Sequence, residues 1–168
     1  MIVVGRQDLM SSGWARIGVT AQRILRKSQV PVLLVAGVRD GSPKTLIVAV
    51  DESDTTSQVI RWGAFLTQQF SAKATVVHAA GVEEAPDEDA WIDTEIGKVS
   101  GVAAMEPRIT RTSSRPAESI IEEARSLGSE LIVIGSRGVG AASQLLFGSV
   151  VESVLLSSPC PVLVVLPA

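Results

Sequence analysis

Short apolar runs alternate along the chain with longer segments in which apolar residues recur every three or four positions. A short continuous apolar run is typical of a strand buried on both faces, and the longer period is typical of an amphipathic helix. The predicted strands cover residues 45–50, 75–79, 108–112, 131–134 and 162–166. The first predicted helix begins after a cap at Ser53 or Asp54 and the third begins at Pro116, while the second and fourth cover residues 87–103 and 149–157. This alternation predicts an α/β fold, a doubly wound parallel sheet of five strands with helices on both faces.

Part of this pattern occurs twice. Residues 1–37 match residues 131–167 without a gap, at an offset of 130 residues and with ten identical positions. Both copies contain an apolar strand, a loop with glycine, a helix, the triplet Pro-Val-Leu and a second apolar strand. The predicted parts of the chain are an extra β-α-β unit at 1–37, a linker at 38–44 and a complete domain at 45–168. Because Met1 aligns with Leu131, inside a predicted strand, we expect a shortened form of a protein with two such domains.

Composition and charge narrow the range of functions. The net charge is −3 and the isoelectric point is about 5.2, whereas a protein that binds nucleic acid needs a basic face. The apolar runs are too short to span a bilayer, and the first residues lack the pattern of a signal peptide, so we expect a cytoplasmic protein. Cys160 is the only cysteine, which excludes an intrachain disulfide, and we interpret it as a buried apolar residue.

A glycine motif follows the predicted strand at 131–134. Its spacing, G-x2-G-x9-G-S, is formed by Gly135, Gly138, Gly148 and Ser149. Glycine lets backbone N–H groups approach a phosphate with no Cβ in the way, and the last two residues open a helix whose unpaired N–H groups favour an anion. Asp51 ends the first strand of the domain, where a carboxylate can accept hydrogen bonds from ribose hydroxyls. The motif therefore predicts a nucleotide site at the carboxyl ends of the strands.

The spacing of this motif resembles the ATP-binding signature of the universal stress protein family. Residues 46–53 are similar to the family's first strand and acidic turn, and residues 158–165 are similar to its closing strand. The resemblance implies the strand order 3-2-1-4-5, a relation to the adenine nucleotide α-hydrolases, and ATP as the ligand, with Mg²⁺ left open. It also implies that Asp51 meets the ribose or adenine and that the backbone of Ala79 borders the adenine. The implied phosphate-binding residues are Gly135, Arg137, Gly138, Gly148, Ser149 and Val150.

The sequence departs from the family pattern in two places. The stretch from residue 81 to residue 108 is shorter than usual, and Val151 stands where some ATP-binding members have threonine. Neither departure affects the glycines. In the first copy Asp8 replaces the second glycine and Val19 replaces the serine. Because a carboxylate repels a polyphosphate, we expect this copy to bind no nucleotide.

The β-α-β unit has an apolar stripe that it cannot bury alone, formed by Trp14, Ile17, Ala21, Ile24 and Leu25. Universal stress domains pair their last strands antiparallel, so the resemblance implies pairing of 32–35 with 162–165 of the same chain or of a partner. This pairing would extend the sheet from five strands to seven. The strand at 2–4 would then be an uncovered edge, which proteins seldom leave exposed. We therefore expect a homodimer that forms through the last strand or through this edge strand.

The residues indicate binding rather than catalysis. His78, the only histidine, has no evident nucleophile as a partner and is interpreted as structural. The acidic stretch at 83–95 matches no known metal-binding loop and is interpreted as a solvated surface. The leading hypothesis is an ATP-binding stress or signalling protein that acts as a nucleotide-dependent interaction module with an unidentified protein partner and at most slow ATP hydrolysis. Two alternatives stay open, a nucleotide-free structural interaction domain of the same fold and an adenylyl-transferring enzyme.

Overall fold

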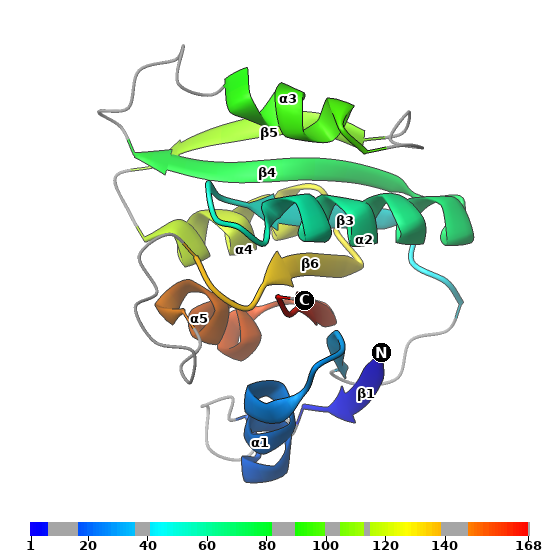
Figure 1. Ribbon diagram of the computed structural model, residues 1–168, viewed down its shortest axis with the longest axis vertical. Helices are drawn as coiled ribbons and strands as arrows, with labels where there is room; N and C mark the ends of the chain where they lie inside the picture. Colours follow the sequence, from blue (N-terminus) through cyan, green and yellow to red (C-terminus); the bar gives the residue numbers. More distant parts are fainter. Residues whose placement is uncertain are drawn as a thin grey trace.

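The fold is known from a computed structural model, which describes residues 1–6, 17–35, 41–81, 90–99, 105–112, 115–138 and 148–167. A single sheet of seven strands crosses the molecule in the order β1-β2-β7-β6-β3-β4-β5 (Figure 1). The strands are β1 (Ile2–Gly5), β2 (Val32–Val35), β3 (Thr45–Val50), β4 (Lys73–Gly81), β5 (Met105–Thr112), β6 (Leu131–Gly135) and β7 (Val162–Val165). The helices are α1 (Val19–Lys27), α2 (Thr56–Phe70), α3 (Ala90–Gly97), α4 (Pro116–Ser126) and α5 (Ser149–Ser157).

The five strands of the later domain are parallel and lie in the order β5-β4-β3-β6-β7, which confirms the order 3-2-1-4-5 implied by the resemblance. The sheet as a whole has seven strands rather than five, because β2 pairs antiparallel with β7 of the same chain. Leu33 lies opposite Leu163 at the centre of this pairing. The expected extension of the sheet is therefore confirmed, with the last strands joined within one chain.

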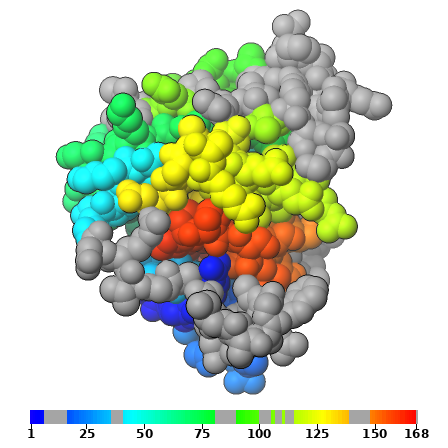
Figure 2. Space-filling view, turned by 180° about the vertical axis from the view of Figure 1, so that it is seen from behind, coloured from blue at the N-terminus to red at the C-terminus, as the bar shows by residue number. Residues whose placement is uncertain are grey.

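Helices cover both faces of the sheet, as the sequence predicts. On one face, apolar residues of α1, α4 and α5 pack against the strands, and Figure 2 shows α4 and α5 side by side on this face. On the other face, α2 and α3 pack against β3, β4 and β6. The apolar positions of α2 on which its prediction rests are all buried: Val59, Ile60, Gly63, Ala64, Leu66 and Thr67. Gly63 is tightly enclosed, since a Cβ there would lie 2.5 Å from Cγ2 of Val48.

The start of α2 differs from the prediction. The N-cap residue is Thr55, and no side chain caps this helix, so the predicted cap at Ser53 or Asp54 is wrong. The turn before the helix is stabilised differently. The N–H of Ser53 donates to Oδ1 of Asp51 at 3.2 Å, and the hydroxyl of Thr56 donates to the carbonyl of Asp51. These bonds tie the end of β3 to the first turn of α2.

The other predicted elements shift at their ends. β4 and β5 are longer than the predicted strands at 75–79 and 108–112, and α3 is shorter than the predicted helix at 87–103. Ile92 of this helix is buried, whereas residue 103 lies outside the described residues. α4 begins with Pro116 in its first turn, as predicted, and Gly128 beyond its end has a φ of +59°, which favours glycine.

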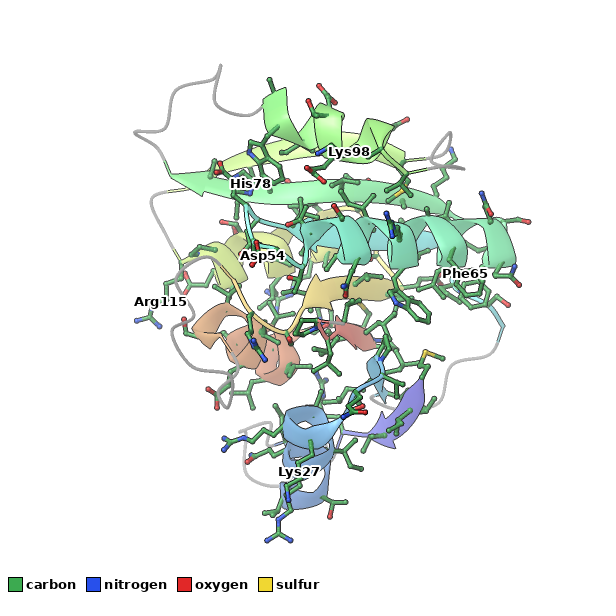
Figure 3. All side chains as sticks on the ribbon, in the orientation of Figure 1. Lys27, Asp54, Phe65, His78, Lys98 and Arg115 are labelled. Carbon is green, nitrogen blue, oxygen red and sulfur yellow. The ribbon has the colours of Figure 1, made fainter. Side chains whose placement is uncertain are left out.

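Helix α3 is joined to the rest of the domain by polar and aromatic contacts. Nδ1 of His78 lies 3.0 Å from the carbonyl oxygen of Val50, and the His78 ring makes an edge-to-face contact with Trp91 of α3 (Figure 3). The carboxylate of Glu95 accepts hydrogen bonds from Nζ of Lys98 at 2.5 Å and from the Ser57 hydroxyl of α2 at 2.7 Å. These two hydrogen bonds, that from Lys98 above all, lower the pKa of Glu95.

The two β-α-β units have the same local structure. α1 and α5 each span nine residues, are preceded by Gly18 and Gly148 as N-caps, and are followed by Ser28 and Ser158 as C-caps. The parallel pairings of β1 with β2 and of β6 with β7 share one register at the offset of 130 residues. Even small turns recur, because the hydroxyls of both serines donate to the carbonyl two residues ahead. That residues 1–37 derive from part of a first domain stays a prediction.

The first unit is held on the domain by apolar packing and by one arginine. Its stripe residues Ala21 and Leu25 are buried in the core shared with α5, while Trp14 lies outside the described residues. Nη1 of Arg6, which follows β1, donates to the carbonyl oxygens of Leu155 at 3.2 Å and Ser158 at 3.1 Å, at the end of α5. A cation at a helix C-terminus also interacts favourably with the helix dipole.

Candidate functional site

A cleft of about 400 Å³ opens at the carboxyl ends of β3, β4 and β6, beside the first turns of α4 and α5. All eight residues that the sequence predicts for the site line this one cleft: Asp51, Ala79, Gly135, Arg137, Gly138, Gly148, Ser149 and Val150. They come from four separate segments of the chain. The segment at 139–147, between the second and third glycines of the motif, lies outside the described residues.

The N-terminus of α5 forms one wall of the cleft. Gly148 is the N-cap, and its N–H donates to the carbonyl of Ser136 at 3.3 Å. The first intrahelical bond that closes on this cap comes from the N–H of Glu152, so the N–H groups of 149–151 have no intrahelical acceptor. Ser149 is exposed, and its neighbours Val150 and Val151 line the cleft. Unpaired N–H groups and the positive end of the helix dipole make this wall a favourable place for an anion.

Two glycines of the motif are packed closely against polar side chains. A Cβ at Gly138 would lie 2.6 Å from Oδ2 of Asp51, and a Cβ at Gly135 would lie 2.7 Å from Oγ1 of Thr55. Real Cβ atoms essentially never come so close to another atom, so both positions require glycine unless the side chains move. At Gly148 the nearest atom would be 3.6 Å away, which is ordinary contact. The third glycine therefore leaves the helix start open, whereas the first two allow close packing around Asp51.

Asp51 brings a fixed carboxylate into the cleft. Its side chain is half-buried, and both its Oδ1 and its main-chain oxygen accept hydrogen bonds from the turn that leads into α2. Arg137 adds a half-buried cationic side chain to the same cleft. A carboxylate held in this way can accept hydrogen bonds from hydroxyl groups of a ligand. The polar part of the cleft thus combines hydrogen-bond acceptors at Asp51 with donors and positive charge at Arg137 and α5.

The rest of the cleft lining is mainly apolar, and the sequence analysis missed these residues. The further lining residues are Ala49, Val50, His78, Pro116, Ile120, Ile134 and Val151. Those on the strands belong to apolar runs and are indistinguishable by sequence from ordinary core residues. One signal was available, because Val50 and Ile134 are the last or nearly the last residues of their strands, where ligands bind in open α/β sheets. This part of the cleft can accept a flat apolar group such as a base.

The described residues contain no group of three or more His, Cys, Asp or Glu side chains that could hold a metal ion. Within the same residues, no helix is long and apolar enough to span a membrane. Cys160 is buried, as predicted. Asp8, which stands in the first copy at the position of the second motif glycine, lies outside the described residues, so the expectation that this copy binds no nucleotide stays a prediction.

The sheet order and the cleft define an α/β protein of the doubly wound class, with a cleft at a topological switch point beside a helix N-terminus. The sequence profile of the universal stress protein family matches residues 43–165, and the chain belongs to this family. A universal stress protein of Thermus aquaticus is 32% identical over 138 residues, which cover 73% of this chain and 98% of that protein.

Solved structures agree with this assignment. A universal stress protein of Archaeoglobus fulgidus matches with a TM-score of 0.78 at 24% identity, and the match covers 99% of this chain and 62% of that longer chain. The present chain thus spans less than two thirds of that protein. Another universal stress protein structure from Archaeoglobus fulgidus, in complex with dAMP, matches with a TM-score of 0.58 at 28% identity, covering 73% of this chain and 97% of that one.

Proposed function

We propose that this universal stress protein binds an adenine nucleotide in the cleft at the start of α5, and that its preferred ligand is ATP. We further propose that it acts in the cytoplasm as a nucleotide-dependent interaction module in a stress or signalling response. The observation that carries the proposal is the convergence of all eight predicted site residues on one cleft from four segments of the chain. The dAMP complex of a family member with 28% identity supports an adenine nucleotide as the ligand class.

Each part of the cleft suits one part of the nucleotide. The phosphates fit the N-terminus of α5, where Gly148 leaves space and the N–H groups of 149–151 are available as donors. The ribose fits beside Asp51, which accepts hydrogen bonds from its hydroxyls. The adenine fits the apolar part, where the main chain of Ala79 can form its border.

A Mg²⁺ ion would be held mainly by the phosphates and by water. Among the described residues that line the cleft, Asp51 is the one carboxylate, and Mg²⁺ commonly binds nucleotide phosphates together with one or two carboxylates. We propose that catalysis is at most slow ATP hydrolysis. Phosphate release measured over hours in the presence and absence of Mg²⁺ tests this point, and turnover at an ordinary enzymatic rate would contradict it.

Self-association stays a prediction. In this chain β7 already pairs with β2, so the last strand of the domain is occupied and the outer edge of β1 is the free edge at that end of the sheet.

Calorimetric titration of the purified chain tests the proposed function. We expect saturable binding of one ATP per chain, weaker binding of adenosine because the phosphates are lost, and weaker binding of GTP because its base differs. The difference between ATP and adenosine measures the contribution of the helix start. If ATP at millimolar concentration produced no binding heat and no increase in melting temperature, the proposed function would be wrong.

A further inference from the structure

The outer strand β1 leaves an apolar surface open that its counterpart β6 does not. Met1, Ile2 and Val3 have 57%, 38% and 60% of their surface exposed. The residues that match them in β6, at 131–133, are 5%, 0% and 0% exposed. Among the strands that the structure describes, β1 is also the last at this end of the sheet, with β2 as its neighbour. Because Ile2 and Val3 match identical residues of β6, their greater exposure reflects what covers β6 and does not cover β1.

In the second unit, β3 and α2 cover the strand β6. β3 runs parallel along its edge, with Ile47 opposite Ile132 and Val48 opposite Val133. The helix that follows, α2, lies on the face that contains Val133, and its buried residues share one apolar cluster with it. A strand and the helix after it therefore cover the edge and one face of β6 together.

The open surface of the first unit matches the surface that β3 and α2 cover. Of the five residues of β6, three recur in the first unit, as Ile2, Val3 and Gly5. On the face that α2 covers, Leu163 and Val165 of β7 recur as Leu33 and Val35 of β2. The backbone is also arranged in the same way, because β1 pairs with β2 in the register in which β6 pairs with β7.

Hydrogen-bonding groups of β1 point to the open side. The N–H groups of Ile2 and Arg6 donate to carbonyls next to or at the end of β2, at 2.9 and 2.7 Å. Because N–H groups alternate between the two sides of a strand, those of Val3 and Gly5 point to the outer edge. The edge contains no charged side chain between Met1 and Gly5, although charges are a common protection of edge strands.

A hollow next to this surface leaves room for a helix. A pocket of about 230 Å³ is lined by Met1, Leu33 and Val35 of the first unit and, on the other side, by Leu66 and Phe70 of α2. Figure 1 shows β1 and the N-terminus beyond the C-terminal half of α2, on the α2 side of the molecule. A second helix placed on β1 and β2 as α2 is placed on β6 and β7 would fill this hollow.

We propose that the first unit is a docking site for a βα segment, an apolar strand followed by an amphipathic helix, with the chemistry of residues 45–70. The strand pairs parallel with β1, and the helix covers Val3, Leu33 and Val35. A second copy of the chain, which the sequence alone led us to expect at this edge, fits the surface less well. Antiparallel pairing of two β1 strands would cover the edges, but it adds no helix to the apolar face. The inference does not depend on nucleotide binding.

A peptide spanning residues 43–72 of this chain is the probe for the proposed docking site, since it contains the strand and helix that cover β6. We expect it to bind the full chain with a stoichiometry of one to one. Hydrogen exchange of the Val3 and Gly5 amides should slow at least about tenfold in the complex. A peptide of the same composition in scrambled order should neither bind the chain nor slow the exchange of these amides.

Val3→Lys is the variant that tests the site, and Val19→Lys is its matched control. Val3 is exposed, so the lysine can reach solvent in the free chain, but it would be buried under the docked helix. Val19, at the start of α1, is also exposed, at 64%, and it lies outside the proposed docking site on β1 and β2. We expect Val3→Lys to weaken peptide binding at least about tenfold and Val19→Lys to leave it unchanged.

Three results would overturn the inference. The first is a folded chain that does not bind the peptide, and the second is binding that Val3→Lys leaves unchanged. The third is a dimer by light scattering, with the Val3 and Gly5 amides already protected, that Val3→Lys converts to a monomer. That last outcome would assign the surface to a second copy of the chain.

Discussion

Gly148→Asp separates nucleotide binding from folding. Gly148 is the N-cap of α5, with a φ of −61° and a ψ of 145°, a conformation open to any L-residue. A Cβ would find its nearest neighbour, the N atom of Gly138, at 3.6 Å. Aspartate is also among the preferred N-cap residues, and it exceeds glycine there by only a few tenths of a kcal/mol. The substitution should therefore leave the free energy of unfolding almost unchanged.

Its effect on ATP binding should be large, because the new carboxylate stands where the phosphates are proposed to bind. Two negative charges about 5 Å apart repel each other by about 3 kcal/mol at an effective dielectric constant of about 20. About 1.4 kcal/mol changes a dissociation constant tenfold. One phosphate charge at that distance thus predicts about a hundredfold weaker binding of ATP, and further charges on the triphosphate add to this loss.

The assay compares three proteins by calorimetry and thermal unfolding: the wild type, Gly148→Asp and Gly148→Ala. Alanine adds the Cβ without the charge, so its affinity for ATP should stay within a few-fold of the wild type. Adenosine binding should change little in either variant, since adenosine has no phosphate. A folded Gly148→Asp protein that binds ATP as well as the wild type would refute the placement of the phosphates at α5.

Three further perturbations test contacts that hold the fold together away from the cleft. Gly63→Ala should destabilise the protein by about 1–3 kcal/mol in urea unfolding, because the added Cβ would overlap Val48, and a neutral effect would contradict the close packing of α2. Arg6→Ala should cost about 1–2 kcal/mol through the lost hydrogen bonds to the end of α5, and the same stability in both proteins would show that these bonds do not hold the first unit. Since Lys98 lowers the pKa of Glu95, this carboxylate stabilises the fold above its usual pKa and loses that effect as the pH falls through the lowered value. Glu95→Gln should therefore flatten the dependence of the melting temperature on pH between about 5 and about 3, and an unchanged pH dependence would exclude the contact.

Much of the fold could be predicted from the sequence, because the strongest local patterns are also the buried ones. The strand at 45–50 and the helix at 149–157 agree with β3 and α5 at both ends. In β3 every residue after Thr45 is buried, which is why the strand has a continuous apolar run rather than an alternating one. The internal repeat, together with the antiparallel pairing of last strands that the family resemblance implies, predicted the pairing of β2 with β7.

The features that could not be predicted depend on contacts between distant residues. The cap of α2 was assigned to Ser53 or Asp54 by residue type alone, whereas the main chain and side chain of Asp51 determine the turn. The contact of Arg6 with α5 joins residues about 150 positions apart. For the cleft, the glycine spacing identified the polar part, but the apolar part required knowledge of which strand ends meet.

The central claim is that ATP occupies the cleft formed by the motif. Backbone amide NMR of the ¹⁵N-labelled chain, titrated with ATP, tests it most directly. The account predicts that the largest shifts of described residues occur at Gly138, at residues 148–151 and at Ala79, while residues 19–27 of α1 stay unchanged. Saturating ATP that leaves the amides of 148–151 unmoved, or that shifts a different surface, would contradict it.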